Sequence, residues 1–230
     1  MITRVRADNP SPLTLSGTNT YVVEEAWVID PGPLFEPHLD AVVAAVAAPA
    51  GVLVTHSHAD HSEAAGELAD RLGVPVVDGL ADGDRIGPFD VLHIPGHADD
   101  HLVFVAGRHA FTGDVVLGEG SVFVSGRLRE YLDGLRRLRA LGLERIHPGH
   151  GDEIDDPQAK LDEYLAHRAE RERKLVAALE AGVAPDDAEA LLDAAWPDAP
   201  VEVRPFAAIT LRAHLGKLRE EGRLGVPPSA

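Results

Sequence analysis

Residues 55–61 read THSHADH, which places three histidines and one aspartate within seven positions directly after the apolar run GVLV. In an extended loop, side chains two residues apart point the same way, so His56 and His58 can bind one ion together. Asp60 and His61 follow where a helix is expected to begin, and they would face a second ion beside the first. Because neutral imidazole nitrogen and carboxylate oxygen are good zinc ligands, the spacing predicts a metal site.

Packing alone does not explain this cluster. A single histidine is more often a core or surface residue than a ligand, but four such side chains at the end of a buried strand would leave several polar groups unpaired, at a cost of several kcal/mol. The chain has no cysteine. Any metal must therefore be held by histidine and carboxylate, without thiolates.

Two metal ions ~3.5–4 Å apart can share a water and clamp a displacement reaction. Such a pair needs about three protein ligands for each ion, so further ligands should lie downstream. Three later loops offer them, each just past an expected strand end: Pro95-Gly96-His97, Thr112-Gly113-Asp114 and Pro148-Gly149-His150-Gly151. In each loop a glycine lets the backbone turn sharply beside the polar residue. The other histidines of this region, His93, His109 and His147, lack that context and are expected to be non-ligands.

The elements that must position these loops are short strands and a few helices. Asn19–Val23 and Ala26–Asp30 predict a hairpin. Further strands are expected at Val52–Thr55, Val74–Val77, Phe89–Ile94, His101–Val105, His109–Thr112 and around Ile146. Periodic apolar residues predict helices at Pro37–Ala48, Ser62–Leu72 and from Leu128 to Leu138. Many short strands with few helices predict an α/β fold of two face-to-face sheets with helices outside.

The chain changes character after Asp155. Helices are expected at Pro157–Ala181, Asp186–Ala195 and Ala207–Glu221. We therefore predict a catalytic domain over residues 1–155 and a small helical domain over residues 156–230, with disorder confined to Val226–Ala230.

Taken in order, THSHADH, PGH, TGD and PGHG, preceded by an IDPG turn, resemble the metallo-β-lactamase-fold hydrolases. The resemblance implies a four-layer αββα sandwich with the site at one edge. It also implies that one zinc is held by His56, His58 and His97 and that Asp114 bridges to a second zinc. The ligands that it implies for the second zinc are Asp60, His61 and His150.

Other segments narrow the resemblance to the subgroup of β-lactamase-like protein 2: GHADDHLVF, FTGDVVLGEGSVF and YLAHRAERER. This subgroup carries a small winged-helix-like domain after the metal core, and Ala213–Gly225 resembles its last helix and the start of a wing. The true β-lactamases of the fold carry a cysteine or a third histidine at the second metal. Asp60 at this position argues against antibiotic hydrolysis.

Three further residues have two interpretations each. Asp30 either accepts a hydrogen bond from a ligating histidine, which would fix its tautomer, or forms the turn before Pro-Gly. His101 either faces the substrate or is a strand-start histidine beside a crowded site. Arg168 either belongs to a solvated helix face or pairs with an anionic group of the substrate.

The expected activity is hydrolysis by hydroxide generated between two divalent ions, most simply Zn²⁺, although nitrogen and oxygen ligands also accept iron or manganese. Asp60 would orient the nucleophile or take its proton. We expect a small ester or thioester substrate, in the manner of glyoxalase II. Cleavage of single-stranded RNA and a non-catalytic metal-binding module are the alternatives.

The net charge and the hydropathy of the chain indicate which nucleic-acid and membrane partners are disfavoured. A net charge of −17 repels a phosphate backbone, which disfavours double-stranded DNA. The N-terminus has no signal-peptide pattern, and the longest apolar run, near Ala41–Ala50, is too short to span a bilayer. We therefore expect a cytoplasmic protein with no membrane partner, and the sequence leaves its oligomeric state open.

Overall fold

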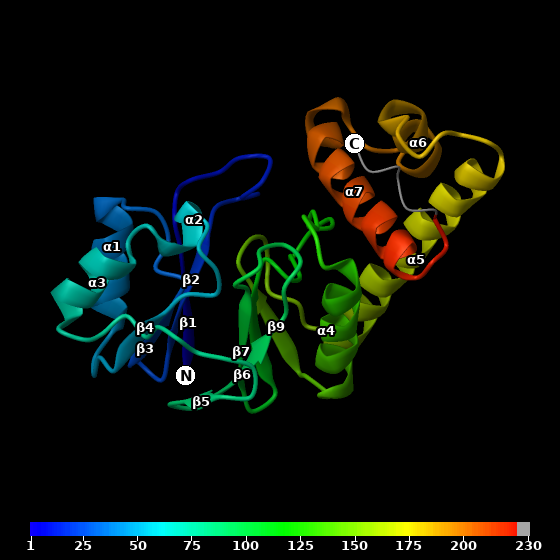
Figure 1. Cartoon of the computed structure of the whole chain (residues 1–230). Coiled ribbons are helices and arrows are strands. Elements are labelled where there is room, and N and C mark those ends of the chain that lie inside the picture. Colours follow the sequence, from blue (N-terminus) through cyan, green and yellow to red (C-terminus); the bar gives the residue numbers. More distant parts are fainter. Residues whose placement is uncertain (225–230) are drawn as a thin grey trace.

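Two β-sheets face each other at the centre of the molecule, and helices cover their outer faces (Figure 1). The structure is a computed structural model that describes residues 1–224. The first sheet has four strands in the order β1 (Ile2–Arg6), β2 (Asn19–Val23), β3 (Trp27–Ile29) and β4 (Gly51–Leu53). The second has five, in the order β5 (Arg85–Ile86), β6 (Phe89–His93), β7 (Leu102–Ala106), β8 (His109–Gly113) and β9 (Arg145–Pro148). Neighbouring strands are antiparallel, except that β3 pairs with β4, and β8 with β9, in parallel.

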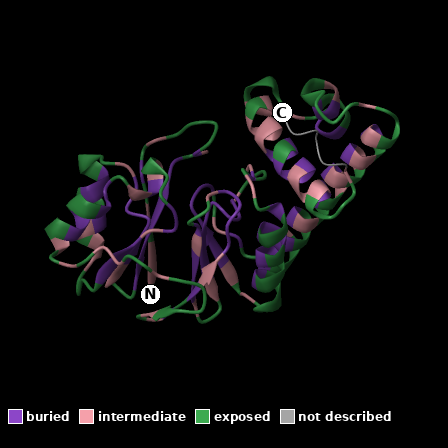
Figure 2. Ribbon diagram, in the orientation of Figure 1, coloured by how far each residue is buried: buried purple, intermediate pink, exposed green. Residues whose placement is uncertain are grey.

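Alternation along the strands separates three layers of apolar packing. Figure 2 shows that buried residues run along both sheets and along the helices that cover them. Val22, Val28 and Val52 of the first sheet pack outward against helices. The residues beside them point inward and meet the second sheet in a buried layer that includes Tyr21, Ile29, Leu53, Phe89, Phe104 and Phe111. The outer face of the second sheet is buried by residues such as Val103, Ala110 and Tyr131.

Helices complete the sandwich. The first sheet is covered by α1 (Glu36–Ala45) and α3 (Ala65–Leu72), and the second by α4 (Leu128–Ala140). The short helix α2 (Ala59–Ser62) lies just beyond the end of β4 (Figure 1). The predicted αββα arrangement is therefore confirmed.

The C-terminal part consists of α5 (Pro157–Glu180), α6 (Ala188–Ala195), the 3-10 turn η1 (Val201–Val203) and α7 (Arg204–Glu220). The first half of α5 packs into the core of the second sheet through Leu161 and Tyr164. Its second half forms a separate core with α6 and α7, which includes Leu175, Leu191 and Leu211. One helix thus belongs to both cores, and the predicted domain boundary at residue 155 stays a prediction.

The winged-helix-like character of this segment also stays a prediction. Between residues 156 and 224 the structure contains helices and turns but no strand that could form a wing. The last residue of the expected wing start, Gly225, and the disorder expected at Val226–Ala230 lie outside the described residues.

Three local expectations were incomplete. The edge strands β1 and β5 were not predicted, because charged residues interrupt their apolar pattern. The expected strand at Val74–Val77 is reduced to a single bridge between Val52 and Val76, since Pro75 has no N–H to donate. The expected helix at Ser62–Leu72 is found as α3, which begins only at Ala65, and the separate short helix α2 precedes it.

Across residues 1–224, no helix is both long enough and apolar enough to cross a membrane.

Candidate metal centre

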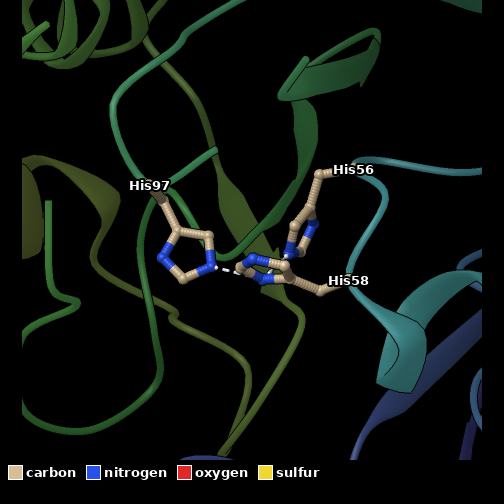
Figure 3. Close-up of side chains that lie close together, drawn as sticks. All are labelled: His56, His58 and His97. Carbon is tan, nitrogen blue, oxygen red and sulfur yellow. Dashed lines mark hydrogen bonds between the residues drawn. The ribbon is translucent and has the colours of Figure 1, made fainter. Parts of the chain in front are cut away.

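Three imidazole rings from two loops meet at one end of the sheets (Figure 3). His58 Nδ1 lies 2.9 Å from His56 Nε2 and 3.0 Å from His97 Nε2. His56 and His58 follow β4, and His97 follows β6 after a turn at Gly96, whose φ of 139° favours glycine. Three nitrogen atoms that converge in this way have the arrangement of ligands around one cation.

A second group lies beside the first and combines one carboxylate with two imidazoles. His150 Nε2 is 3.2 Å from Asp60 Oδ2 and 3.3 Å from His61 Nε2. His61 Nε2 is 3.6 Å from the same Asp60 oxygen. Asp60 and His61 come from α2, and His150 comes from the loop after β9. These separations are close to the spacing of neighbouring ligands at a site with metal–ligand bonds of ~2.0–2.2 Å.

Asp114, just past β8, lies between the two groups. Its Oδ2 is 3.5 Å from His97 Nε2, and its Oδ1 is 3.4 Å from His150 Nε2 and 3.5 Å from His61 Nε2. Oδ1 is buried and has no hydrogen-bond partner among the described residues. A buried carboxylate oxygen without a partner is unfavourable. A cation on each side of Asp114 would satisfy both oxygens, so the donor set fits two metal ions.

The buried carboxylate of Asp30 orients one histidine of each group. Its Oδ2 accepts hydrogen bonds from His61 Nδ1 and from Thr55 Oγ1, both at 2.9 Å, and its Oδ1 accepts from the Thr55 backbone N–H at 2.7 Å. Thr55 Oγ1 in turn accepts from His56 Nδ1 at 3.0 Å. In their neutral form, both histidines therefore carry the proton on Nδ1 and present the Nε2 lone pair to the centre. Of the two interpretations of Asp30, this contact matches the hydrogen-bond acceptor.

Backbone carbonyls orient two more histidines. His97 Nδ1 donates to the carbonyl of Phe123 and His150 Nδ1 donates to that of Gly17, each at 3.3 Å. Gly17 has a φ of 121°, and a Cβ there would lie 2.0 Å from the Ala7 oxygen, so only glycine fits. Sequence reasoning missed these carbonyls and Thr55. A carbonyl has no residue type to recognise, whereas Thr55 could have been found from its position directly before the histidine cluster.

His101 lies behind the centre. It is fully buried, and its ring stacks on that of His56 with 4.5 Å between centroids and 15° between planes. Nδ1 donates to the Leu102 carbonyl, and Nε2 accepts from the backbone N–H of Asp114, both at 3.1 Å. Both nitrogens are used, which does not match the substrate-facing interpretation.

Arg168 is also buried, so its interpretation as part of a solvated helix face is wrong. Its guanidinium donates to Ser121 Oγ at 3.0 Å and to the carbonyl of Val122. Its pairing with a substrate anion stays a prediction.

The expected non-ligands lie outside the two donor groups and do not include Asp114. His147 contacts Glu153 at 2.9 Å and His109 at 3.0 Å, and His93 contacts the Asp99 carbonyl at 2.7 Å.

The electrostatic environment differs between the two groups. Burial lowers the pKa of His56 and of His97. Burial also opposes protonation of His150, but Asp114 and Asp60 outweigh it and raise the pKa of His150 to about 9. The pKa of His61 is likewise raised, against burial, by Asp114 and Asp30. Negative potential is therefore concentrated at the second group, where protons occupy positions suited to a cation.

Comparison with known proteins gives the same family as the sequence motifs. Residues 13–78 match the model of the Metallo-beta-lactamase superfamily. A beta-lactamase-like protein 2 homolog from Drosophila melanogaster is 30% identical over 100% of this chain and 91% of its own length. An atrochrysone carboxyl ACP thioesterase from Aspergillus chevalieri is 35% identical over 77% of this chain and 65% of its own. A metallo-beta-lactamase family protein from Thermus thermophilus superposes with a TM-score of 0.79 at 23% identity, covering 97% of this chain and 95% of that one.

The chain belongs to the metallo-beta-lactamase superfamily. Within it, the similarity to beta-lactamase-like protein 2 homologs extends over the whole chain, as the sequence resemblance implied.

Replacing Asp30 by Asn puts an amide in place of the carboxylate that accepts from His61 and Thr55. We expect the affinity for metal to fall by about tenfold to a hundredfold, because two ligating histidines lose the group that orients them. Competition with a chromogenic chelator measures this change. Asp78→Asn, at a position outside the centre, is the control. Wild-type affinity in the Asp30→Asn variant would contradict the role of Asp30.

The two groups should also respond differently to pH. A cation at Asp60, His61 and His150 must displace protons. Because the pKa of His150 is about 9, affinity at this group should rise as pH increases from 6.5 towards 9. The lowered pKa values of His56 and His97 reduce that competition at the other group. Chelator competition across this pH range should therefore resolve one equivalent with the steeper pH dependence, and identical profiles for both equivalents would contradict the assignment.

Proposed function

We propose that the chain is a metal-dependent hydrolase with two divalent ions that cleaves a thioester or a related ester of a small acyl substrate. The observation that carries the proposal is the pair of donor groups joined by Asp114 in a member of this superfamily. One ion would be held by His56, His58 and His97, and the other by Asp60, His61 and His150, with Asp114 contacting both. Zinc is the simplest choice for these ligands, and iron or manganese is compatible with them.

Two such ions supply, when bound, Lewis acidity and a lowered pKa of water, so that hydroxide is available near neutral pH. The protein's own part is to hold the ligands in fixed tautomers, through Asp30, Thr55 and the two backbone carbonyls. Asp114 contributes an ionised carboxylate: burial raises its pKa, but the imidazoles of His61 and His150 hold that pKa well below its usual value.

Asp60 is the carboxylate best placed to act on the reacting water. Its side chain is 30% exposed, against 10% for Asp114, so Asp60 is the more open of the two to the solvent side. Burial raises the pKa of Asp60, but the hydrogen bond from His150 and the charge on His61 have the larger combined effect. The pKa of Asp60 is therefore lowered overall, and the carboxylate is ionised at neutral pH. An ionised carboxylate can orient water and accept its proton.

The choice of substrate is supported by chemistry and by similarity. The thioesterase from Aspergillus chevalieri shares 35% identity with the matched part of this chain. The chain is strongly acidic, which disfavours long polyanionic substrates. A small acyl thioester is consistent with both observations.

The test is a substrate panel with zinc-loaded protein: acyl thioesters, lactones and a labelled single-stranded RNA. We expect turnover of thioesters, and we expect Asp114→Ala to remove it while the fold persists, because both cations lose a shared ligand. Asp152→Ala, at an exposed position, is the matched control and should keep wild-type kcat/KM.

Cleavage of RNA alone would replace the proposed substrate. Full activity and full metal content in the Asp114→Ala variant would contradict the bridging role. No turnover of any substrate in the panel, with both metals bound, would favour a non-catalytic metal-binding module.

A further inference from the structure

We infer that helices α5 and α7 position His97 through the loop of residues 117–125, with Arg168 and Thr210 as the positioning residues. The helical C-terminal part would then be a structural component of the metal centre. This inference rests on the proposed function, which gives His97 a cation to bind.

The first step is that residues 123–125 of this loop form hydrogen bonds with His97 and with the backbone beside it. The Ser125 backbone N–H donates to the Gly96 carbonyl at 2.7 Å, and Ser125 Oγ donates to the carbonyls of Gly96 and His97 at 3.1 Å. The Phe123 carbonyl accepts from His97 Nδ1, and the Phe123 ring packs on the imidazole with 4.6 Å between centroids. Both the backbone and the tautomer of His97 therefore depend on where residues 123–125 lie.

The second step is that this loop has no regular structure of its own. It lies between β8, which ends at Gly113, and α4, which begins at Leu128, and it contains neither helix nor strand. Val122 and Val124 are nevertheless buried. Its conformation must therefore be fixed by the elements that it contacts.

Helix α5 contacts the loop through two side chains. The buried guanidinium of Arg168 donates to Ser121 Oγ and to the Val122 carbonyl. One turn earlier on the helix, Tyr164 Oη accepts from the Leu117 backbone N–H at 2.9 Å. The helix thus holds the loop at its beginning and at its middle.

Helix α7 contacts the loop through two further side chains. Thr210 Oγ1, which is buried, accepts from the Val124 backbone N–H at 3.1 Å. The Phe206 ring packs on Phe123 with 5.4 Å between centroids. Helix α7 therefore contacts the side chain of Phe123, which orients His97, and also the backbone of the next residue, Val124.

Arg171 offers a matched control on the same helix. Like Arg168, it is buried and donates to a backbone carbonyl, here that of Ala195. Each guanidinium also lies over an aromatic ring. The distance from Cζ to the ring centroid is 5.8 Å for Arg171 and Trp196 and 5.7 Å for Arg168 and Tyr131. Its hydrogen bonds go to His167, Ala195 and Asp198, and none goes to the loop.

The experiment compares Arg168→Met, Thr210→Val and Arg171→Met in the full chain. Zn²⁺ binding is followed by chelator competition that resolves two equivalents, and Co²⁺ absorption reports the ligand geometry. His97→Ala identifies the equivalent held by His56, His58 and His97. We expect Arg168→Met and Thr210→Val to raise the Kd of that equivalent by about tenfold or more and to alter its Co²⁺ spectrum. The Kd of the other equivalent should not change, and Thr210→Ser should restore binding.

Arg171→Met should leave both equivalents and the Co²⁺ spectrum unchanged, although it weakens packing within the helical part. If Arg168→Met does not fold, the isosteric Thr210→Val carries the test alone. Wild-type Kd values and spectrum in the Thr210→Val variant, or an equal loss in Arg171→Met, would overturn the inference. A wild-type chain that binds no second metal would instead refute the proposed function.

Discussion

The structure depends on holding several imidazole nitrogens and carboxylate oxygens close together at one end of the two sheets. His58 Nδ1 has two other ring nitrogens within 3.0 Å, and one oxygen of Asp114 is buried without a hydrogen-bond partner among the described residues. Such an arrangement is unfavourable until cations occupy it, because each nitrogen must expose its lone pair to the same point. The hydrogen bonds that the histidines donate to Asp30, Thr55 and the backbone carbonyls maintain this geometry.

The two packed sheets hold in place the strand ends from which the donor loops begin. Each candidate ligand lies just beyond a strand or in the short helix α2, so the buried layer between the sheets fixes where every loop begins. These donors are far apart in the sequence, from His56 to His150. The parallel pair β8 and β9 brings the loops of Asp114 and His150 together, and the parallel pair β3 and β4 brings Asp30 beside Thr55.

The sequence predicted what residue types and periodicity can encode. Strands with alternating apolar residues and helices with periodic leucines were found, and the histidine and aspartate donors could be named because their spacing is distinctive. Edge strands such as β1 were missed because their polar residues face solvent. The carbonyls of Gly17 and Phe123 could not be found, since any residue has one and only the folded chain brings it to a histidine. The burial of Arg168 was missed for a related reason: its partner is a loop 46 residues away in the sequence.

The central claim is that two cations lie side by side and share Asp114. Anomalous diffraction from crystals of the zinc-loaded protein, recorded on both sides of the zinc absorption edge, tests this claim most directly. The account predicts two peaks about 3.5–4 Å apart, one among His56, His58 and His97 and the other among Asp60, His61 and His150. A single peak, or none within reach of Asp114, would contradict it.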